Sequence, residues 1–348
     1  MIKKIFAFTL AMLFVLNTAA FADTKKPKAR KKASSQSNRL VALLPASDGV
    51  MFLDVQRLLN EALPQVFSSD PAKLNEINQQ IDQLKAQTGF DVRQFEQIAV
   101  GITFVTTATS KNTIEPVVLA RGKYNSSALL TMAKIAAKGK YREEKIGNKA
   151  VYIFAAKEIL TENKSKITNN SPNKAFDFLL KKMPSEIAVT PVDANTLAIG
   201  SIARVRETVE NKARIGADIA SMLNRKPNSL MSFAANTPAG LKQFFQLDDD
   251  MFGQSLASIR QIYGAVNLSG GNVVGFVGAK SLNAEQAKSL EETLGGLQAL
   301  GKGFLASARS EEKQVYARIV DSVKITRAGL EVGIDFQVAN TDLGLLIK

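Results

Sequence analysis

The last strand-forming segment of the chain alternates apolar and polar side chains with a period of two. The apolar set and the residues between them are Leu330, Val332, Ile334, Phe336 and Val338 against Glu331, Gly333, Asp335 and Gln337. Successive side chains of a β-strand point to opposite faces, so this segment predicts a strand with one covered and one solvated face. Such a pattern is typical of an antiparallel sheet.

Short turns between apolar segments predict further antiparallel strand pairs. The turn sequences are Gly147-Asn148, Asp193-Ala194-Asn195, Ser269-Gly270-Gly271-Asn272 and Arg327-Ala328-Gly329. They are rich in Gly, Asn and Asp, which favour the tight turns of hairpins. Helices alternate with these strands, and the clearest one begins after Asp70, with Pro71 in its first turn, and ends at Gly89. The sequence therefore predicts an α+β fold.

The two halves of the chain repeat one order of predicted elements: strand, helix, two adjacent strands, helix and hairpin. Residues 97–101 (Gln-Ile-Ala-Val-Gly) correspond to 261–265 (Gln-Ile-Tyr-Gly-Ala), and residues 116–123 correspond to 273–280. A diverged duplication is the interpretation that we favour. The alternative is chance, because any α+β chain contains strands that are followed by helices.

The repetition predicts two related domains, at residues 40–212 and 226–348, each a largely antiparallel sheet with helices packed on one face. Leu-Pro-Ala-Ser-Asp at 44–48, Asn-Ala-Glu-Gln-Ala-Lys at 283–288 and the hairpin at 327–329 carry a further likeness. In these segments the chain resembles uncharacterised exported bacterial proteins with paired α+β domains. The resemblance implies a fold, and it implies no activity.

Residues 1–22 have the pattern of a secretory signal peptide. Lys3 and Lys4 precede an uncharged apolar segment of about 12 residues, which is shorter than the ~20 needed to span a bilayer. Ala20 and Ala22 form the small-x-small pattern that signal peptidase recognises, and no cysteine follows for lipid attachment. We expect cleavage after Ala22 and a periplasmic or secreted protein without a transmembrane segment. The alternatives are a buried N-terminal helix and an inverted membrane anchor.

Residues 23–39 form a basic linker that contains no large apolar side chain, so we expect it to be disordered. The net charge of the chain is +13, of which the signal peptide contributes +2 and the linker +6, leaving +5. The linker is either a soluble spacer or an electrostatic tether to an anionic envelope surface or polymer. We do not expect nucleic acid binding, because no aromatic residues accompany these charges. The basic cluster consists of Lys25, Lys26, Lys28, Arg30, Lys31 and Lys32.

Cysteine, histidine and tryptophan are absent from the chain. Their absence excludes thiol nucleophiles, imidazole bases, and zinc or haem ligation by histidine. Without disulfides, an exported chain must be stable through packing alone. We therefore predict no catalytic residue, no cofactor-binding residue, no cofactor and no metal ligand.

Two glycine patterns have the spacing of nucleotide-binding loops but lie in a different context. Gly296 to Gly303 matches a phosphate loop except that Gly303 replaces the Ser or Thr, and a helix precedes it. We interpret it as a helix end with glycine caps. Gly271, Gly275 and Gly278 lie within a predicted hairpin, whereas a dinucleotide loop joins a strand to a helix. We interpret them as sites of close backbone packing.

Ser-x-x-Lys, the nucleophile pair of some exported acyl-enzymes, occurs at Ser171/Lys174 and at Ser310/Lys313. The partner motifs Ser-Asp-Asn and Lys-Thr-Gly are absent. Pairs with this spacing arise by chance in a chain rich in Ser and Lys. The sequence therefore gives little support to a serine hydrolase, and no feature selects a carboxylate pair for a glycosidase.

Asp248-Asp249-Asp250 could supply oxygen ligands for calcium, but adjacent carboxylates do not converge on one ion without help from other segments. We interpret them as a solvated turn or a helix N-terminus. Phe244, Phe245 and Phe252 flank them. We expect these rings in the core, and an exposed position would make them a protein-docking patch.

We predict an exported cell-envelope protein of unknown activity with a non-enzymatic binding or scaffolding role and a protein partner. One alternative is an envelope hydrolase that uses carboxylates or a Ser/Lys pair, which requires a deep cleft with converging groups. Another is a carrier of an apolar ligand, which requires an apolar cavity of several hundred Å3.

Overall fold

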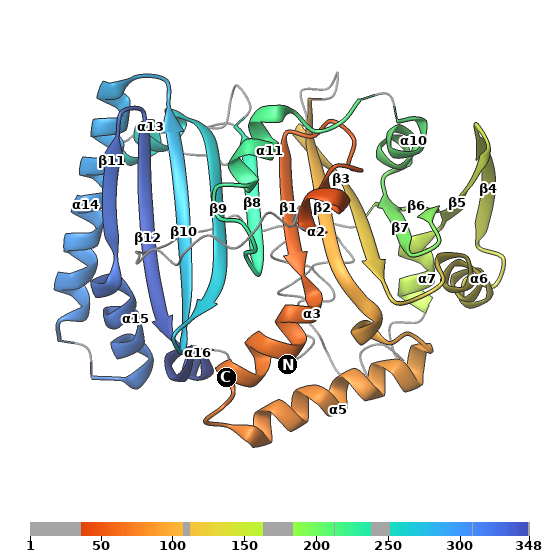
Figure 1. The fold of residues 1–348 in the computed structure, drawn as a ribbon, viewed down its shortest axis with the longest axis horizontal. Coiled ribbons are helices and arrows are strands. Elements are labelled where there is room, and N and C mark those ends of the chain that lie inside the picture. The colour runs from red at the N-terminus through yellow and green to blue at the C-terminus, as the bar shows by residue number, and fades with distance from the viewer. Residues whose placement is uncertain are drawn as a thin grey trace.

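The computed structural model describes residues 36–106, 112–162, 184–211, 213–237, 251–307 and 309–346 (Figure 1). Within these residues twelve strands form one sheet. The strands are β1 (Gly49–Asp54), β2 (Phe95–Thr106), β3 (Asn112–Gly122), β4 (Tyr141–Ile146), β5 (Lys149–Phe154), β6 (Ile187–Asp193), β7 (Thr196–Gly200), β8 (Met231–Asn236), β9 (Ile259–Ser269), β10 (Asn272–Ser281), β11 (Lys324–Ala328) and β12 (Glu331–Ala339). Their order is β11-β12-β10-β9-β8-β1-β2-β3-β7-β6-β5-β4, and each neighbouring pair is antiparallel.

Helices surround the sheet, and none of those in the described ranges is long and apolar enough to cross a membrane. In Figure 1, α14 and α15 lie at the β11 end of the sheet, and α6 and α7 lie near the β4 end. The described helices are α2 (Gln36–Val41), α3 (Val55–Arg57), the π-helical η1 (Leu58–Ala62), α4 (Leu63–Val66), α5 (Pro71–Thr88), the 3-10 turn η2 (Val92–Gln94), α6 (Ser126–Ala136), α7 (Ala156–Glu162), α10 (Ile202–Glu210), α11 (Ala217–Leu223), α13 (Met251–Ala257), α14 (Ala284–Leu305), α15 (Glu311–Ser322) and α16 (Asn340–Leu346).

Helices cover both faces of the sheet. In β5, Val151 and Ile153 belong to the main core with α10, whereas Phe154 packs against Leu130 of α6. In β9, Tyr263 belongs to the main core with α11, whereas Ile262 packs in the cluster that contains α14. Because adjacent strand residues point to opposite faces, α10 and α11 cover one face, and α6 and α14 cover the other.

The predicted hairpins and helix caps are present. The turns at 147–148, 194–195, 270–271 and 329–330 join β4 to β5, β6 to β7, β9 to β10, and β11 to β12. Asp70 accepts a hydrogen bond from the Lys73 amide at the start of α5, and Gly89 ends this helix at a φ of 71°. In β12, Val332, Ile334 and Val338 are buried, which confirms the covered face.

The two halves of the sheet have the same topology. Outward from the central β1·β8 pair, the order β1-β2-β3-β7-β6 matches the order β8-β9-β10-β12-β11. The registers also match: Gln97 of β2 lies opposite Asp54, and Gln261 of β9 lies opposite Asn236. Both β2·β3 and β9·β10 contain a register shift next to this glutamine. The two sequence segments that resemble each other therefore occupy equivalent positions.

The central strand pair has the geometry of a pseudo-two-fold axis. Met51 precedes Asp54 by three residues, and Phe233 precedes Asn236 by three residues, so the two positions are equivalent. Met51 and Phe233 lie directly opposite each other in the β1·β8 ladder. Where a two-fold axis perpendicular to the sheet passes between two antiparallel strands, equivalent residues of the two halves lie directly opposite each other, as Met51 and Phe233 do.

The structure corrects two parts of the predicted architecture. We expected a separate sheet in each half, whereas β1 and β8 pair directly and unite all described strands in one sheet. We expected helices on one face, whereas both faces are covered, because strands such as β5 are apolar on both sides. The boundaries of two domains stay a prediction.

Some helix boundaries also differ from the prediction. The helix after Asp54 continues past Pro64, and it does so through a π-helical turn in which the Leu63 amide donates to the Leu58 carbonyl. This wider turn accommodates a proline, which has no amide hydrogen to donate. The first helix begins at Gln36, four residues before the expected start of the folded body at Leu40. The helix that begins after Asn283 continues to Leu305, through the glycines that we interpreted as its end.

Candidate functional site

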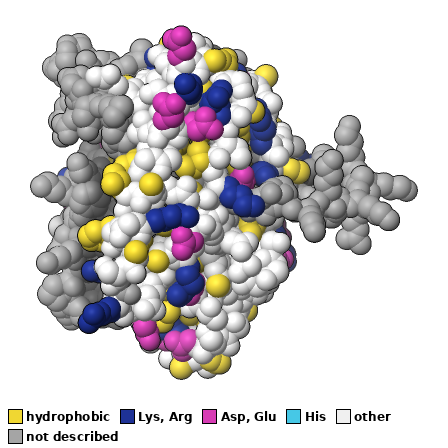
Figure 2. All heavy atoms as spheres, turned by 90° about the vertical axis from the view of Figure 1, so that its left-hand side faces the viewer, with side chains coloured by type: hydrophobic (Ala, Val, Ile, Leu, Met, Phe, Trp, Pro, Cys, Tyr) yellow, Lys and Arg dark blue, Asp and Glu magenta, His cyan; other side chains and the backbone are white. Residues whose placement is uncertain are grey.

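Three large apolar side chains on α14 are exposed to solvent. Leu297 is 44% exposed, Leu300 is 72% exposed and Phe304 is 76% exposed. Their spacing of three and four residues places them along one side of the helix. We call these three residues the α14 stripe. Figure 2 looks onto the side of the molecule where α14 lies, and it shows apolar side chains mixed with basic and acidic ones.

Four glycines lie in the same half of α14 as the α14 stripe, two directly before Leu297 and two between Leu300 and Phe304. A Cβ added to Gly295, Gly296 or Gly303 would meet no atom within 4 Å, so packing inside the chain does not require glycine there. Glycine in a helix is less stable than alanine by about 0.5–1 kcal/mol. Gly296 and Gly303 lie on the side of the helix next to Leu300, so these two positions form open notches beside the α14 stripe, where another backbone can approach closely.

The same glycines correct one prediction. Gly296 to Gly303, which we interpreted as a helix end, lies inside α14, and the helix continues to Leu305 with Ala306 as its C-cap. Among these glycines, Gly301 faces the chain itself, with the Val320 side chain 3.6 Å from its virtual Cβ. The segment has no loop of amides that could surround a phosphate.

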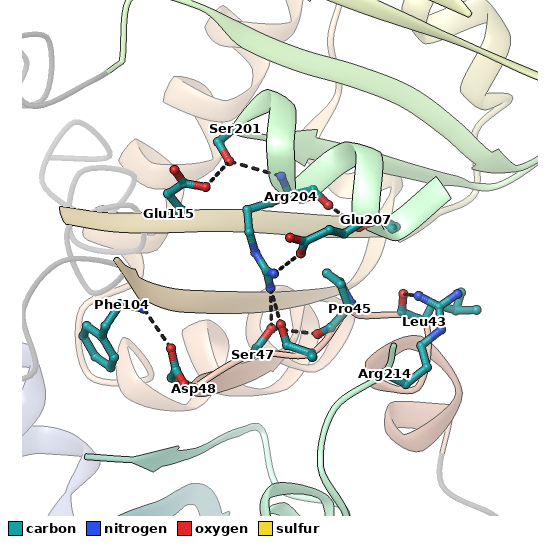
Figure 3. Close-up of polar contacts among 12 residues, drawn as sticks. Leu43, Pro45, Ser47, Asp48, Phe104, Glu115, Ser201, Arg204, Glu207 and Arg214 are labelled. Atoms are coloured by element: carbon teal, nitrogen blue, oxygen red, sulfur yellow. Dashed lines mark hydrogen bonds and ion pairs between the residues drawn. The ribbon is translucent and has the colours of Figure 1, made fainter. Parts of the chain in front are cut away.

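A second polar arrangement surrounds Arg204 of α10 (Figure 3). The side chain is 4% exposed and donates from Nη2 to the Ala46 carbonyl and to Ser47 Oγ, each at 2.7 Å. Its Nη1 donates to Glu207, which is half exposed. Its Nε is buried and has no hydrogen-bond partner among the described residues. The guanidinium therefore holds the Ala46–Ser47 segment against the sheet.

Further contacts fix the same N-terminal segment. Asp48 donates its amide to the Ile102 carbonyl, and its carboxylate accepts the Phe104 amide, each at 2.8 Å. Gly101 makes room for this contact, because a Cβ there would lie 2.5 Å from Ser47 Oγ. Arg214 donates to the Leu43 carbonyl at 2.8 Å, and burial lowers the pKa of its guanidinium. These contacts hold the Leu-Pro-Ala-Ser-Asp segment against β2.

Tyr263 forms a third cluster, at the boundary between α11 and the sheet. Its ring lies against Gly278, and the guanidinium of Arg225 lies 5.0 Å from the ring centroid. Tyr263 Oη donates to Glu331 at 3.2 Å, and Arg225 binds both oxygens of Glu331 at 2.7 and 3.0 Å. Burial, and then the charge of Glu331, raise the pKa of Tyr263 to about 12. The phenol therefore stays protonated at neutral pH and acts as a structural donor.

Two shallow depressions in the described surface are lined mainly by residues with polar or charged side chains. One, of about 460 Å3, lies beside Arg57 and the β9–β10 turn. The other, of about 540 Å3, lies beside the β6–β7 turn, where Arg121 pairs with Asp193 at 3.2 Å. Burial opposes ionisation of Asp193, but the Asn195 amide and Arg121 lower its pKa on balance. Neither depression is the deep cleft with converging groups that an envelope hydrolase requires. Neither is the apolar cavity that a carrier of an apolar ligand requires.

Of the two Ser-x-x-Lys pairs, the structure describes Ser310 and Lys313. Ser310 is the N-cap residue of α15, and the Lys313 ammonium lies 5.9 Å from the centroid of the Phe304 ring. Gly275 and Gly278 lie in β10, where Phe336 and Tyr263 pack against them, as predicted for close packing. The prediction was wrong for Gly271, which lies in the β9–β10 turn at a φ of 77° with no atom within 4 Å of its virtual Cβ. No group of three or more Asp and Glu side chains in the described ranges could hold a metal ion.

Several predicted residues lie outside the described residues. These are the signal peptidase positions Ala20 and Ala22, the cluster Lys25, Lys26, Lys28, Arg30, Lys31 and Lys32, the pair Ser171 and Lys174, Asp248 to Asp250, and Phe244 and Phe245. Phe252 lies in α13, but its side chain is not described.

Neither the α14 stripe nor Arg204 stands out in the sequence as a candidate site. Apolar residues at three- and four-residue spacing on a helix normally indicate a buried face, so Leu297, Leu300 and Phe304 read as core. The four glycines of this helix could have indicated an unusual surface, because glycine destabilises a helix and packing on a sheet seldom requires it. Arg204 had no signal, since Ala46 and Ser47, the partners that it holds against the sheet, lie more than 150 residues away in sequence.

No known protein family and no curated protein matches the chain at a significant level. The structure is similar to three crystal forms of TP0453, a protein of Treponema pallidum. Crystal form III has a TM-score of 0.44 and 9% identity, and crystal forms I and IV have TM-scores of 0.42 with 9% and 10% identity. Each comparison covers 88% of this chain and 95–96% of TP0453. The class defined by the fold is an α+β protein whose described strands form one antiparallel sheet of twelve.

Proposed function

We propose that this chain is an exported cell-envelope protein that acts by binding or scaffolding other macromolecules. The observation that carries this proposal is the α14 stripe, which exposes Leu300 and Phe304 at 72% and 76%. Exposed large apolar side chains that are grouped on a surface mark interaction sites in soluble domains. Glycine notches beside them favour a close backbone approach by a partner.

The export part of the proposal rests on the sequence of residues 1–22. A cationic start, a short apolar segment and Ala20-Phe21-Ala22 support cleavage after Ala22 and a mature chain that begins at Asp23. Intact mass of the protein isolated from the periplasm or the medium tests this. A chain that retains residues 1–22 would contradict it.

We also propose that the basic cluster between Lys25 and Lys32 tethers the protein to an anionic surface. Each Lys or Arg near such a surface contributes about 1 kcal/mol, and salt screens the attraction. Binding of the mature protein to vesicles with anionic lipids should exceed binding to neutral vesicles and should fall with salt. A chain with the six basic residues replaced by Gln is the control, and equal binding by both chains would refute the tether.

The two related domains belong to the same proposal. The matched strand order and the self-matched Met51–Phe233 pair support an origin by duplication. Outside the common strands the halves differ in the crossover, which contains α6, β4, β5 and α7 in the first half and α14 and α15 in the second. The α14 stripe thus lies where the second half departs from the first.

The experiment that tests the binding role is cross-linking in intact cells followed by mass spectrometry. We compare the natural chain with Leu300→Asp, and we use Ile135→Asp as the control because Ile135 of α6 is exposed to the same degree, at 73%. We expect a defined set of cross-linked macromolecules that Leu300→Asp loses and Ile135→Asp keeps. The same set in all three chains would refute the role of the α14 stripe.

A further inference from the structure

The two ends of α14 differ in charge. Its N-terminal half, residues 284–294, contains three glutamates and one lysine, and the 66% exposed Glu292 lies 3.6 Å from Lys288. At its C-terminal end, Lys313 of α15 lies over the ring of Phe304 in the α14 stripe. An antiparallel contact between two such helices therefore sets an acidic end against a basic end.

In an antiparallel contact between two α14 helices, the glycine notch of one copy can receive a side chain of the α14 stripe of the other. If Leu300 of one copy lies level with Gly296 of the other, two-fold symmetry places the second Leu300 against the first Gly296. Gly296 has no atom within 4 Å of its virtual Cβ, so it leaves space for the leucine. The same register sets Phe304, with Lys313 above it, level with Glu292 of the partner copy. Shape and charge are thus matched in one register.

We propose that α14 is the contact through which two copies of this chain form a symmetric antiparallel dimer. The proposal rests on the binding role proposed above for the α14 stripe and names its partner. The net charge of this surface agrees with it: residues 284–322 contain six acidic and five basic residues, whereas the chain from residue 40 onward carries +5. A nearly neutral surface lets two basic proteins meet with little repulsion.

The size of the contact indicates a weak dimer. A 22-residue helix is about 33 Å long and offers roughly 350 Å2 to a partner. A standard interface buries about 800 Å2 on each partner. We therefore expect a dimer that forms at high protein concentration and dissociates on dilution.

Sedimentation velocity of the chain that begins at Asp23, over a wide concentration range, tests the proposal. We expect the mass to rise from monomer to dimer, with Leu300→Asp weakening association at least tenfold and Ile135→Asp leaving it unchanged. Circular dichroism of each variant checks that it is folded. A protein that stays monomeric at every concentration, or a dimer that Leu300→Asp does not weaken, would overturn the proposal.

The absence of cysteine from the chain allows a second measurement. An equimolar mixture of Gly296→Cys and Leu300→Cys chains should form a disulfide-linked dimer under mild oxidation, because the proposed register sets position 296 of one copy level with position 300 of the other. A mixture of Gly296→Cys and Ile135→Cys chains should not. Equal disulfide formation in both mixtures would also overturn the dimer. If the protein is monomeric but Leu300→Asp still loses its cross-linked partners in cells, the dimer fails and the binding role stands. If no partner is lost, both fail.

Discussion

Replacement of Arg204 by methionine tests how the N-terminal segment is held. Methionine keeps most of the apolar volume but removes the donors to the Ala46 carbonyl and Ser47 Oγ, both at 2.7 Å. Hydrogen bonds from a charged donor contribute about 1.5–3 kcal/mol each. The variant also removes a buried charge, which offsets part of that loss. Glu207 is half exposed, so water solvates it in the variant.

We expect Arg204→Met to lower the free energy of unfolding by about 3 kcal/mol. Urea unfolding followed by circular dichroism measures this change, since the chain contains no tryptophan for fluorescence. Amide exchange should also rise at Phe104, whose amide donates to Asp48 in the same segment. Arg206→Ala is the matched control: Arg206 is 48% exposed and pairs with Glu144, so its loss should cost less than about 1 kcal/mol.

Equal stability of Arg204→Met and the natural chain would refute this reasoning. It would mean that burial of the guanidinium, with Nε unpaired, costs as much as its contacts contribute. A loss of stability without faster exchange at Phe104 would show that Arg204 acts on the sheet and not on the N-terminal segment.

Two other substitutions have clear expected outcomes. Gly303→Ala should raise the stability of α14 by about 0.5–1 kcal/mol, because the added methyl meets no atom within 4 Å; a lower melting temperature would contradict the open notch. Tyr263→Phe should lessen the fall in stability between pH 10 and 12, because the raised pKa of Tyr263, about 12, means that the unfolded chain loses this proton first. Unfolding curves across that range measure the effect, and an unchanged slope would show that the phenol ionises normally in the fold.

Much of the local structure follows from residues close together in sequence. Asp70, Pro71 and Gly89 determine the ends of α5, and the turn residues determine the four predicted hairpins. The alternation in β12 also predicts its buried face correctly. In each case the physical cause lies within a few residues, which is why the sequence alone was sufficient.

The joining of the halves could not be read in the same way. β1 is apolar on both faces, and β8 carries small or apolar side chains such as Ala235 and Ala234 on both, which is compatible with a separate sheet in each half and with one shared sheet. The choice depends on the pairing of Met51 with Phe233 across more than 180 residues. Likewise, the exposure of Leu300 depends on which elements reach α14 in space, and periodicity alone predicts a buried stripe.

Photo-cross-linking from position 300 in intact cells tests most directly whether the α14 stripe is a binding surface. A photoreactive residue at position 300 should capture a discrete set of products, including a second copy of the chain, and the same residue at position 135 should not. Identical products from both positions, or none from position 300, would contradict the proposed function.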